Sequence, residues 1–225
     1  MVIKAIFFDF GGVLTKSCWD LKVMANLIIK AFEEYNIKLP NKFTDTFIGV
    51  MKEKWKKVLK TSKEERLEDI LQEIFDKLNI PNNQKAFERA IDYIMDAPFC
   101  IIREETEYVL KELKKMGVKI GIISNSPIAF HERILRKHGL LEYIDDIVVS
   151  CDVSYRKPHP KIYEIALKRL NVMPKEALFV GDVLEIDIVG AKKIGMKTVL
   201  IETGDPAWKE GREFLDPVDN INPDY

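Results

Sequence analysis

The sequence predicts an α/β fold: a Rossmann-like, doubly wound parallel sheet that carries an inserted helical cap subdomain. Two patterns predict it. In the second half of the chain, short apolar runs that end in a polar residue alternate with helical patterns, which is typical of a parallel sheet with crossover helices. Between the first and second apolar runs, a long stretch contains helical patterns alone. The 225 residues suffice for one domain with such an insert.

Five apolar runs are predicted as strands because each is short and ends at polar or turn residues. Strands of a parallel sheet are buried on both faces, so the lack of strict apolar–polar alternation favours this kind of sheet. The predicted strands are residues 3–9, 119–124, 146–150, 177–182 and 198–202.

Helical patterns occupy most of the chain between the later strands. Gly117, Gly139 and Gly195 follow three of these patterns, and glycine is preferred just after the last turn of a helix. The predicted helices of this part are residues 104–116, 128–138, 161–170 and 186–194.

The stretch between the first two strands is predicted to hold about four helices. Apolar residues recur in it at helical spacing, as in the stripe that begins at Leu67, and Ser62 with Glu65 fits a capping box before that stripe. The expected division is an α/β core of residues 1–16 and 97–225 and a helical cap of residues 17–96.

The charge balance indicates partners that are small molecules or proteins. Lys and Arg number 35 against 36 Asp and Glu, so the net charge is -1, and no excess of one sign favours nucleic acid or an anionic membrane. No apolar run approaches the ~18 residues of a membrane span, and no signal peptide is recognisable. Homo-oligomerisation stays open.

The cysteines predict neither a disulfide framework nor a zinc site. Cys18, Cys100 and Cys151 are odd in number, far apart in the sequence and without CxxC spacing. Free thiols are typical of a reducing compartment, so the expected location is the cytoplasm.

Polar residues end several of the predicted strands, and they are the candidate site. Ligands of an open parallel sheet bind beyond the carboxyl ends of its strands, where these residues should converge. A lysine in a proline-rich loop before a helix is added to them. The candidates are Asp9, Ser124, Asn125, Lys157, Asp182 and Asp187.

This set of side chains suits phosphoryl transfer. Clustered carboxylates such as Asp9 and Asp182 favour a hard divalent cation, most plausibly Mg²⁺. With the cation screening its charge, an aspartate can approach a phosphate dianion as a nucleophile. Lys157 then supplies fixed positive charge and Ser124 a hydrogen bond to the phosphoryl oxygens.

Four motifs in order give the chain a family resemblance. They are "FFDFGGVL", "IISNS", "RKPHPKIY" and "FVGDVLEID", the last followed by "GAKKIGM". The chain resembles hydrolases of the haloacid dehalogenase-like (HAD) superfamily with a helical cap of the C1 type. The likeness covers the core to about residue 202, whereas the insert matches in position and helical character only.

The resemblance implies catalytic roles for matching positions. Asp9 would be the nucleophile that becomes an aspartyl-phosphate, and Ser124, Asn125 and Lys157 would bind the phosphoryl group. The metal ligands would be Asp9, Asp182 and the backbone carbonyl of Gly11, with Asp187 supporting the metal or Lys157.

Gly11 departs from the common phosphatase motif, which has an aspartate there as general acid and base. Metal binding should survive, because the backbone carbonyl remains. Loss of proton transfer costs a factor of ~10² to 10⁴, and we therefore expect a preference for good leaving groups. An aspartate restored at position 11 would be strained if the backbone there had a positive φ.

Three functions compete at this stage. The leading one is a Mg²⁺-dependent phosphatase of a small phosphorylated metabolite. A phosphate-binding or regulatory protein with weak catalysis is the alternative that Gly11 suggests. A 2-haloacid dehalogenase also fits the missing carboxylate, but "GDVLEID" retains acids that only a metal site needs.

The remaining expectations concern histidines and the last residues. His159 is predicted to cap the helix that follows it, and His131 and His138 are predicted to lie on the surface. Residues 213–225 are predicted to be largely irregular, with the adjacent sheet edge exposed or covered by another chain.

Overall fold

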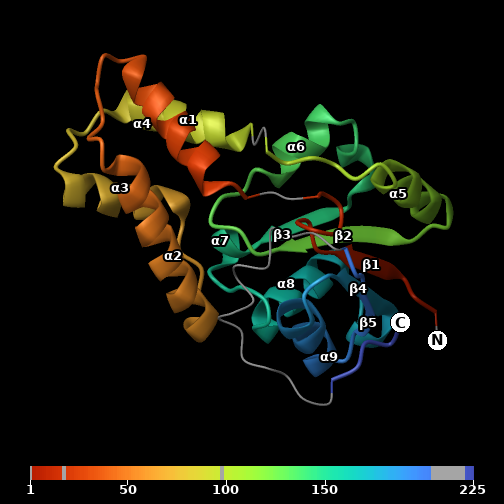
Figure 1. Ribbon diagram of the computed structural model, residues 1–225. Helices are drawn as coiled ribbons and strands as arrows, with labels where there is room; N and C mark the ends of the chain where they lie inside the picture. Colours follow the sequence, from red (N-terminus) through yellow and green to blue (C-terminus); the bar gives the residue numbers. More distant parts are fainter. Residues whose placement is uncertain (1, 17–18, 97–98, 204–220) are drawn as a thin grey trace.

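The computed structural model describes residues 2–16, 19–96, 99–203 and 221–225. In these parts of the chain, five strands form one parallel sheet in the order β3-β2-β1-β4-β5, which is the doubly wound arrangement that the sequence predicts (Figure 1). All five strands lie within the predicted runs or one residue outside them. They are β1 (Ala5–Phe8), β2 (Lys119–Ser124), β3 (Asp146–Val149), β4 (Ala177–Gly181) and β5 (Lys197–Leu200).

Helices cover both faces of the sheet. On one face, Phe8 and Ile122 pack in a cluster with Leu110 and Leu135 of the covering helices, and on the other face Phe7 packs in a cluster that includes Tyr163. The strands are therefore buried on both sides, as their near-continuous apolar sequences predict. The first face carries α5 (Thr106–Lys115) and α6 (His131–Lys137), and the second carries α8 (Pro160–Leu170) and α9 (Val189–Lys193).

Short elements complete the core. A single helical turn, α7 (Ser150–Val153), follows β3, and 3₁₀ turns occupy Leu141–Tyr143 and Pro174–Glu176. The segment Leu184–Ile188, predicted as regular helix from residue 186, is a π-helical turn that continues into α9. None of the described helices has the length and apolarity to cross a membrane.

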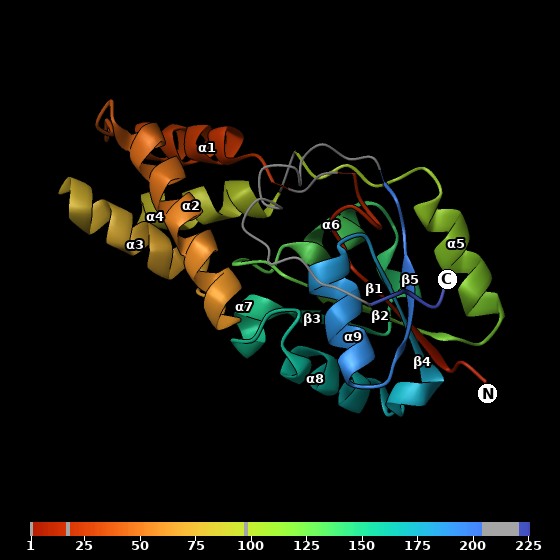
Figure 2. The ribbon, with the colours of Figure 1, turned by 60° about the horizontal axis from the view of Figure 1, so that its bottom comes forward.

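The insert between β1 and β2 consists of helices, as predicted. In the two ribbon views they lie together on one side of the sheet (Figures 1 and 2). They are α1 (Leu21–Glu33), α2 (Phe43–Thr61), α3 (Leu67–Leu78) and α4 (Gln84–Met95).

The predicted capping box at the start of α3 is wrong. Ser62 is instead the residue that ends α2, with a left-handed φ of 53°, and Arg66 precedes α3 without a side-chain capping bond. Glu65 accepts hydrogen bonds from Lys54 and Lys57, each at 2.7 Å. Two charged donors on α2 thus hold the carboxylate that the capping box would need.

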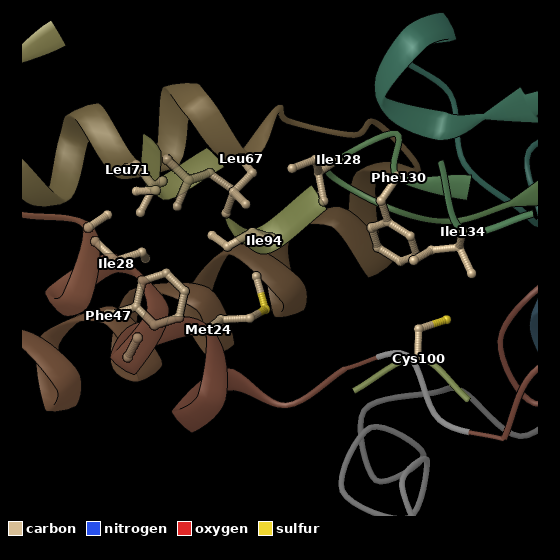
Figure 3. Close-up of a cluster of buried hydrophobic side chains, with 14 of the residues drawn as sticks. Met24, Ile28, Phe47, Leu67, Leu71, Ile94, Cys100, Ile128, Phe130 and Ile134 are labelled. Carbon is tan, nitrogen blue, oxygen red and sulfur yellow. The ribbon is translucent and has the colours of Figure 1, made fainter. Parts of the chain in front are cut away.

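Insert and core share one hydrophobic cluster. Figure 3 shows side chains of the insert in the same cluster as Ile128, Phe130 and Ile134, which lie in and just before α6. A second contact joins the α2–α3 connection to the core, where Glu64 accepts a 2.8 Å hydrogen bond from the Ser150 hydroxyl. The labelled insert residues in the cluster are Met24, Ile28, Phe47, Leu67, Leu71 and Ile94.

The prediction of no disulfide is wrong for Cys100. Cys100 is disulfide-bonded, whereas Cys151 is a buried free thiol and Cys18 lies outside the described residues. Distance along the sequence misled the prediction, because the two connections between core and insert run side by side. Thr15 pairs with Ile102 in antiparallel fashion next to Cys100.

The last residues partly agree with the prediction. Residues 221–225 are irregular, as expected, and residues 213–220 lie outside the described part of the chain. The edge of β5, however, is covered by the chain itself: the Leu200 N–H donates to the Tyr225 carbonyl at 3.2 Å, and the Asp224 N–H donates to the Thr198 carbonyl at 3.1 Å. A hydrogen-bonded tail thus replaces the expected exposed edge.

Candidate active site

The predicted strand-end acids converge at the centre of the sheet. Asp9 follows β1 and Asp182 follows the neighbouring strand β4, and Asp187 lies in the π-helical turn after β4. Carboxylate oxygens of the three residues lie within 4.8 Å of one another, and all three side chains are buried. This point is where the strand order reverses, which is the usual ligand position in such sheets.

Lys157 joins two of these carboxylates. Its Nζ lies 2.8 Å from Asp9 Oδ1 and 2.8 Å from Asp187 Oδ1, and only 1% of the lysine side chain is exposed. The Phe10 N–H also donates to Asp9 Oδ1 at 2.7 Å. Burial alone would lower the pKa of Lys157, but the carboxylates of Asp187 and Asp9 outweigh burial and raise it. Lys157 is therefore a fixed cation next to Asp9.

Negative charge exceeds positive charge in this cluster when all the acids are ionised. Burial raises the pKa of Asp9 to about 6, against the pull of Lys157. Burial and repulsion from Asp9 and Asp187 raise the pKa of Asp182 to about 8. Clustered carboxylate oxygens are the ligands that Mg²⁺ prefers, and a divalent cation would offset the excess charge. The residues present therefore fit a hard divalent cation.

The π-helical turn holds Asp187 in place. Its Oδ2 accepts hydrogen bonds from the backbone N–H groups of Asp182, at 3.2 Å, and Val183, at 3.1 Å. The Tyr163 hydroxyl lies 3.0 Å from the Ile186 carbonyl and 2.9 Å from the Asp187 carbonyl, so α8 supports the irregular turn. Asp187 thus fixes both Lys157 and the backbone that carries Asp182.

Asn125 contacts the loop of Lys157. Its amide nitrogen donates to the Lys157 carbonyl at 3.0 Å, and its amide oxygen accepts from the Lys157 N–H at 2.8 Å. These paired bonds join the end of β2 to the loop that precedes α8. The structure therefore shows Asn125 positioning Lys157, and its contact with a phosphoryl group stays a prediction.

His131 was expected on the surface, and this expectation is wrong. Only 1% of the residue is exposed, and its Nε2 lies 2.8 Å from the hydroxyl of Ser124. The imidazole stacks on Phe130 at 4.7 Å between ring centroids and meets Phe10 edge-on. Burial and the positive charge of Lys157 lower the pKa of His131 to about 3, so the ring is neutral at ordinary pH.

Helical periodicity could have revealed this burial. His131 begins α6, and Ile134 and Leu135, three and four residues later, are buried on the same face of the helix. His159 behaves as predicted, because its Nδ1 accepts the Lys161 N–H at the start of α8.

The two glycines after β1 differ in what they tolerate. A Cβ added to Gly11 would meet no described atom within 4 Å, and positive φ occurs at Gly12, with a value of 82°. At Gly12 a Cβ would lie 2.2 Å from Asp182 Oδ2. The strain considered for position 11 therefore belongs to Gly12, where the backbone passes against a carboxylate of the cluster.

A pocket opens above these residues, between core and insert. Asp9, Gly11, Ser124 and Lys157 line it from the strand ends together with Asn125, His131 and Asp187. Trp19 and Trp55 line it from the segment before α1 and from α2. The tryptophans were not among the predicted site residues, because their local sequence does not indicate that they lie beside residues far away in the chain, such as Asp9 and Lys157.

Comparison with known proteins agrees with this geometry. Residues 3–195 match the family model of haloacid dehalogenase-like hydrolases. Over 208 residues the chain is 32% identical to a glyceraldehyde 3-phosphate phosphatase of Pyrococcus abyssi, and the match covers 90% of this chain and 83% of that enzyme.

Solved structures give the same result at the level of the fold. A HAD phosphatase from Thermococcus onnurineus has a TM-score of 0.56 and 26% identity, covering 92% of this chain and 90% of that one. A 2-haloacid dehalogenase from Pseudomonas syringae has a TM-score of 0.67 at 21% identity, with the same coverage, and shows likeness of fold alone.

The chain belongs to the haloacid dehalogenase-like hydrolase family. Within that family it is an enzyme of the phosphatase class.

Proposed function

We propose that this enzyme is a Mg²⁺-dependent phosphatase that hydrolyses a small phosphorylated metabolite through an aspartyl-phosphate on Asp9. The observation that carries the proposal is the position of Asp9. It directly follows the central strand β1, contacts the buried ammonium of Lys157 at 2.8 Å and lines the same pocket as Ser124. The similarity to a glyceraldehyde 3-phosphate phosphatase supports a phosphorylated substrate of small size.

In the proposed first step, a carboxylate oxygen of Asp9 attacks phosphorus and the bond from phosphorus to the leaving oxygen breaks. Lys157 keeps its proton and faces the phosphoryl oxygens, while the Ser124 hydroxyl donates a hydrogen bond to them. Water then attacks the phosphorus of the aspartyl-phosphate, which releases inorganic phosphate and restores the carboxylate of Asp9.

The metal site of the proposal uses the acids of the cluster. Asp9, Asp182 and the backbone carbonyl of Gly11 would hold Mg²⁺, and Asp187 would support the site through Lys157 and the backbone of Asp182. When bound, the ion neutralises charge on the phosphoryl oxygens as a Lewis acid.

The insert is proposed to act as the cap of this site. The division into a core of residues 1–16 and 97–225 and a cap of residues 17–96 is supported by the two connections that run side by side at Thr15 and Ile102. Trp19 and Trp55 of the cap line the pocket that also contains Asp9, Ser124 and Lys157, which we call the phosphate pocket.

The absence of a side chain at Gly11 favours one alternative, a phosphate-binding protein with weak catalysis. Gly11 offers no side chain for proton transfer, so the chain would serve as a phosphate-binding protein if turnover were negligible. Dehalogenation is disfavoured, because Asp9 and the two carboxylates clustered with it form a set of oxygen ligands that a reaction without a metal does not need.

The test measures inorganic phosphate released from a panel of phosphate monoesters that includes glyceraldehyde 3-phosphate, with Mg²⁺ and with excess chelator. We expect turnover with Mg²⁺, none with chelator, and none for Asp9→Asn. Asp45→Asn, an exposed acid in the first turn of α2, is the matched control and should retain wild-type rates. Binding of phosphate without turnover of any ester would support the binding protein, and full activity of Asp9→Asn would exclude the mechanism.

A further inference from the structure

The turn that follows β1 is attached to the connection by which the chain returns from the cap to the core. The Lys16 N–H donates to the Ile101 carbonyl at 2.7 Å, and the Arg103 N–H donates to the Leu14 carbonyl at 3.0 Å. The two segments therefore run side by side, although they are far apart in the sequence.

The side chain of Arg103 extends from this connection to the turn. It is half-buried, and its Nε donates a hydrogen bond to the Gly12 carbonyl at 2.9 Å. Among the residues that the structure describes, no acidic side chain forms an ion pair with this guanidinium. A charged donor makes a stronger hydrogen bond to a carbonyl than a neutral donor does. The guanidinium is therefore directed at the backbone of the turn.

Gly12 is held at both of its peptide groups. Its N–H donates to the Lys16 carbonyl at 3.1 Å, and its carbonyl accepts from Arg103. The first of these peptide groups also contains the Gly11 carbonyl, because a planar peptide bond joins the carbonyl of one residue to the nitrogen of the next. Gly12 has a φ of 82°, and glycine restrains its own dihedral angles less than other residues do. The two hydrogen bonds therefore restrain the orientation of the Gly11 carbonyl.

The backbone of Gly12 also packs on the acidic cluster. A Cβ on Gly12 would lie 2.2 Å from Asp182 Oδ2, so the main chain passes close to this carboxylate. The Gly11 carbonyl and Asp182 are both ligands in the proposed metal site. The conformation of Gly12 therefore affects how these two ligands are placed relative to each other.

We propose that Arg103 is a positioning residue for the metal site: its hydrogen bond to Gly12 holds the turn that carries the Gly11 carbonyl, and this raises the affinity for Mg²⁺. The proposal rests on the proposed phosphatase function. Arg103 is not among the described residues that line the phosphate pocket, so it acts through the turn. Groups that hold metal ligands in place typically change metal affinity by about 10- to 100-fold.

The test titrates Mg²⁺ into the full-length, chelator-treated protein by isothermal calorimetry, which requires no turnover. Arg103→Met keeps an unbranched apolar stem and removes the donor, and we expect its Kd for Mg²⁺ to rise about tenfold or more. Arg103→Lys keeps the charge and a donor, so its Kd should rise less. A wild-type Kd in folded Arg103→Met would overturn the inference.

Steady-state kinetics give a second measurement. In Arg103→Met the Mg²⁺ concentration for half-maximal turnover of phenyl phosphate should rise by the same factor as the Kd. At saturating Mg²⁺, kcat should stay within about twofold of the wild-type value, because the bound ion then holds the Gly11 carbonyl. A lower kcat with an unchanged Mg²⁺ requirement would contradict the assigned role.

Thr106→Val is the matched control for a loosened turn. The Thr106 hydroxyl donates to the Leu14 carbonyl of the same turn at 2.8 Å, and not to Gly12. This variant should lower the melting temperature and leave the Kd for Mg²⁺ unchanged. Arg136→Met, at an exposed arginine of α6, controls for the loss of a positive charge. An equal loss of affinity in either control would overturn the specific role of Arg103.

Circular dichroism shows first whether each variant folds. If Arg103→Met is unfolded, Arg103→Gln takes its place, because it keeps a weaker, neutral donor. Its Kd should rise at least about threefold, and a wild-type Kd would again overturn the inference. Failure of the proposed function is distinguishable, because the wild type itself would then bind no Mg²⁺ or hydrolyse no ester.

Discussion

At the level of single residues, Gly11 and Gly12 stand side by side under different constraints. Gly11→Asp should fold, because nothing described lies within 4 Å of a Cβ there and the positive φ belongs to Gly12. The new carboxyl group should raise kcat on alkyl phosphates, by up to about 10²-fold, and raise it less on aryl phosphates, whose leaving oxygens need less proton help.

Steady-state kinetics on methyl and phenyl phosphate would check this prediction, after circular dichroism has shown that the variant folds. Gly11→Ala is the control that changes the backbone without adding an acid. A folded, Mg²⁺-binding Gly11→Asp with no gain on methyl phosphate would show that another group already supplies the proton.

His131 is expected to orient the hydroxyl of Ser124. In the neutral tautomer that carries its proton on Nε2, the N–H donates to Ser124 Oγ and leaves the hydroxyl proton for a phosphoryl oxygen. His131→Phe keeps the aromatic stacking and should reduce kcat/KM about tenfold, the loss expected for one hydrogen bond in the site.

A double-mutant cycle separates this role from a structural one. The loss caused by His131→Phe should disappear in the Ser124→Ala background, because the residue then has nothing to orient. The pH profile of His131→Phe should parallel that of the wild type, since the pKa of about 3 keeps the imidazole from titrating near neutrality. Additive losses would rule out action through Ser124.

Asp9, Asp182 and Lys157 could be placed near one another from the sequence because each stands at the end of an apolar run or in a loop before a helix, and Asp187 because it follows Asp182 by about one helical turn. His131 and the tryptophans could not be predicted in the same way. Their relevance arises from contacts across the fold, such as the approach of α6 to the end of β2 and of α2 to the pocket.

At the level of elements, the Asn125 amide connects the end of β2 to the loop before α8. Asn125→Ala removes the two hydrogen bonds between the Asn125 side chain and the backbone of Lys157, and we expect a loss of about 1–3 kcal/mol in the free energy of unfolding. Turnover should fall as well, because the Lys157 loop is less well fixed. Urea denaturation and kcat measure the two effects.

Asn125→Asp serves as the matched variant. It keeps an acceptor for the Lys157 N–H and loses the donor to the Lys157 carbonyl, so its stability should lie between those of wild type and Asn125→Ala. Identical stability of all three proteins would show that the paired bonds contribute nothing measurable.

Element boundaries were predictable where local chemistry decides them. Strand ends coincide with polar residues, and glycines follow α5, α6 and α9. The prediction failed where residues from another element intervene. Glu65 pairs with lysines of α2, and the turn around Asp187 is widened to a π-helix whose carbonyls meet Tyr163.

For the whole molecule, the carboxylate cluster makes stability depend on pH and on Mg²⁺ together. Asp9 and Asp182 have raised pKa values of about 6 and about 8 in the folded protein, against an ordinary value of 3.8. At pH values between the ordinary pKa of 3.8 and these raised values, the metal-free folded state holds more protons than the unfolded state. The stability of the metal-free protein therefore falls as pH rises through this range.

Mg²⁺ should therefore raise the melting temperature more at about pH 8 than at about pH 5.5, where protons compete with the ion. Thermal denaturation with Mg²⁺ and with chelator at both values measures the effect. Asp182→Asn should flatten the pH dependence of the metal-free protein. An equal shift at both pH values would show that the acids of the cluster do not bind the ion.

The topology class of the whole molecule could be predicted from the sequence, whereas the disulfide and the position of the C-terminal tail could not. Alternating strands and helices predict a doubly wound sheet from sequence alone. The disulfide at Cys100 and the tail at Asp224 and Tyr225 depend on segments that meet only in three dimensions.

The central place of β1 also bears on how the protein folds. Ala5 pairs with Lys119 on one side and with Ala177 on the other, so the strand that leads to Asp9 forms its ladders only with partners far along the chain. Contacts of such long sequence separation slow folding, because loop closure precedes their formation. During synthesis, β1 must wait until β4 has left the ribosome before it is flanked on both sides. The site can therefore assemble only after nearly the whole core has been made.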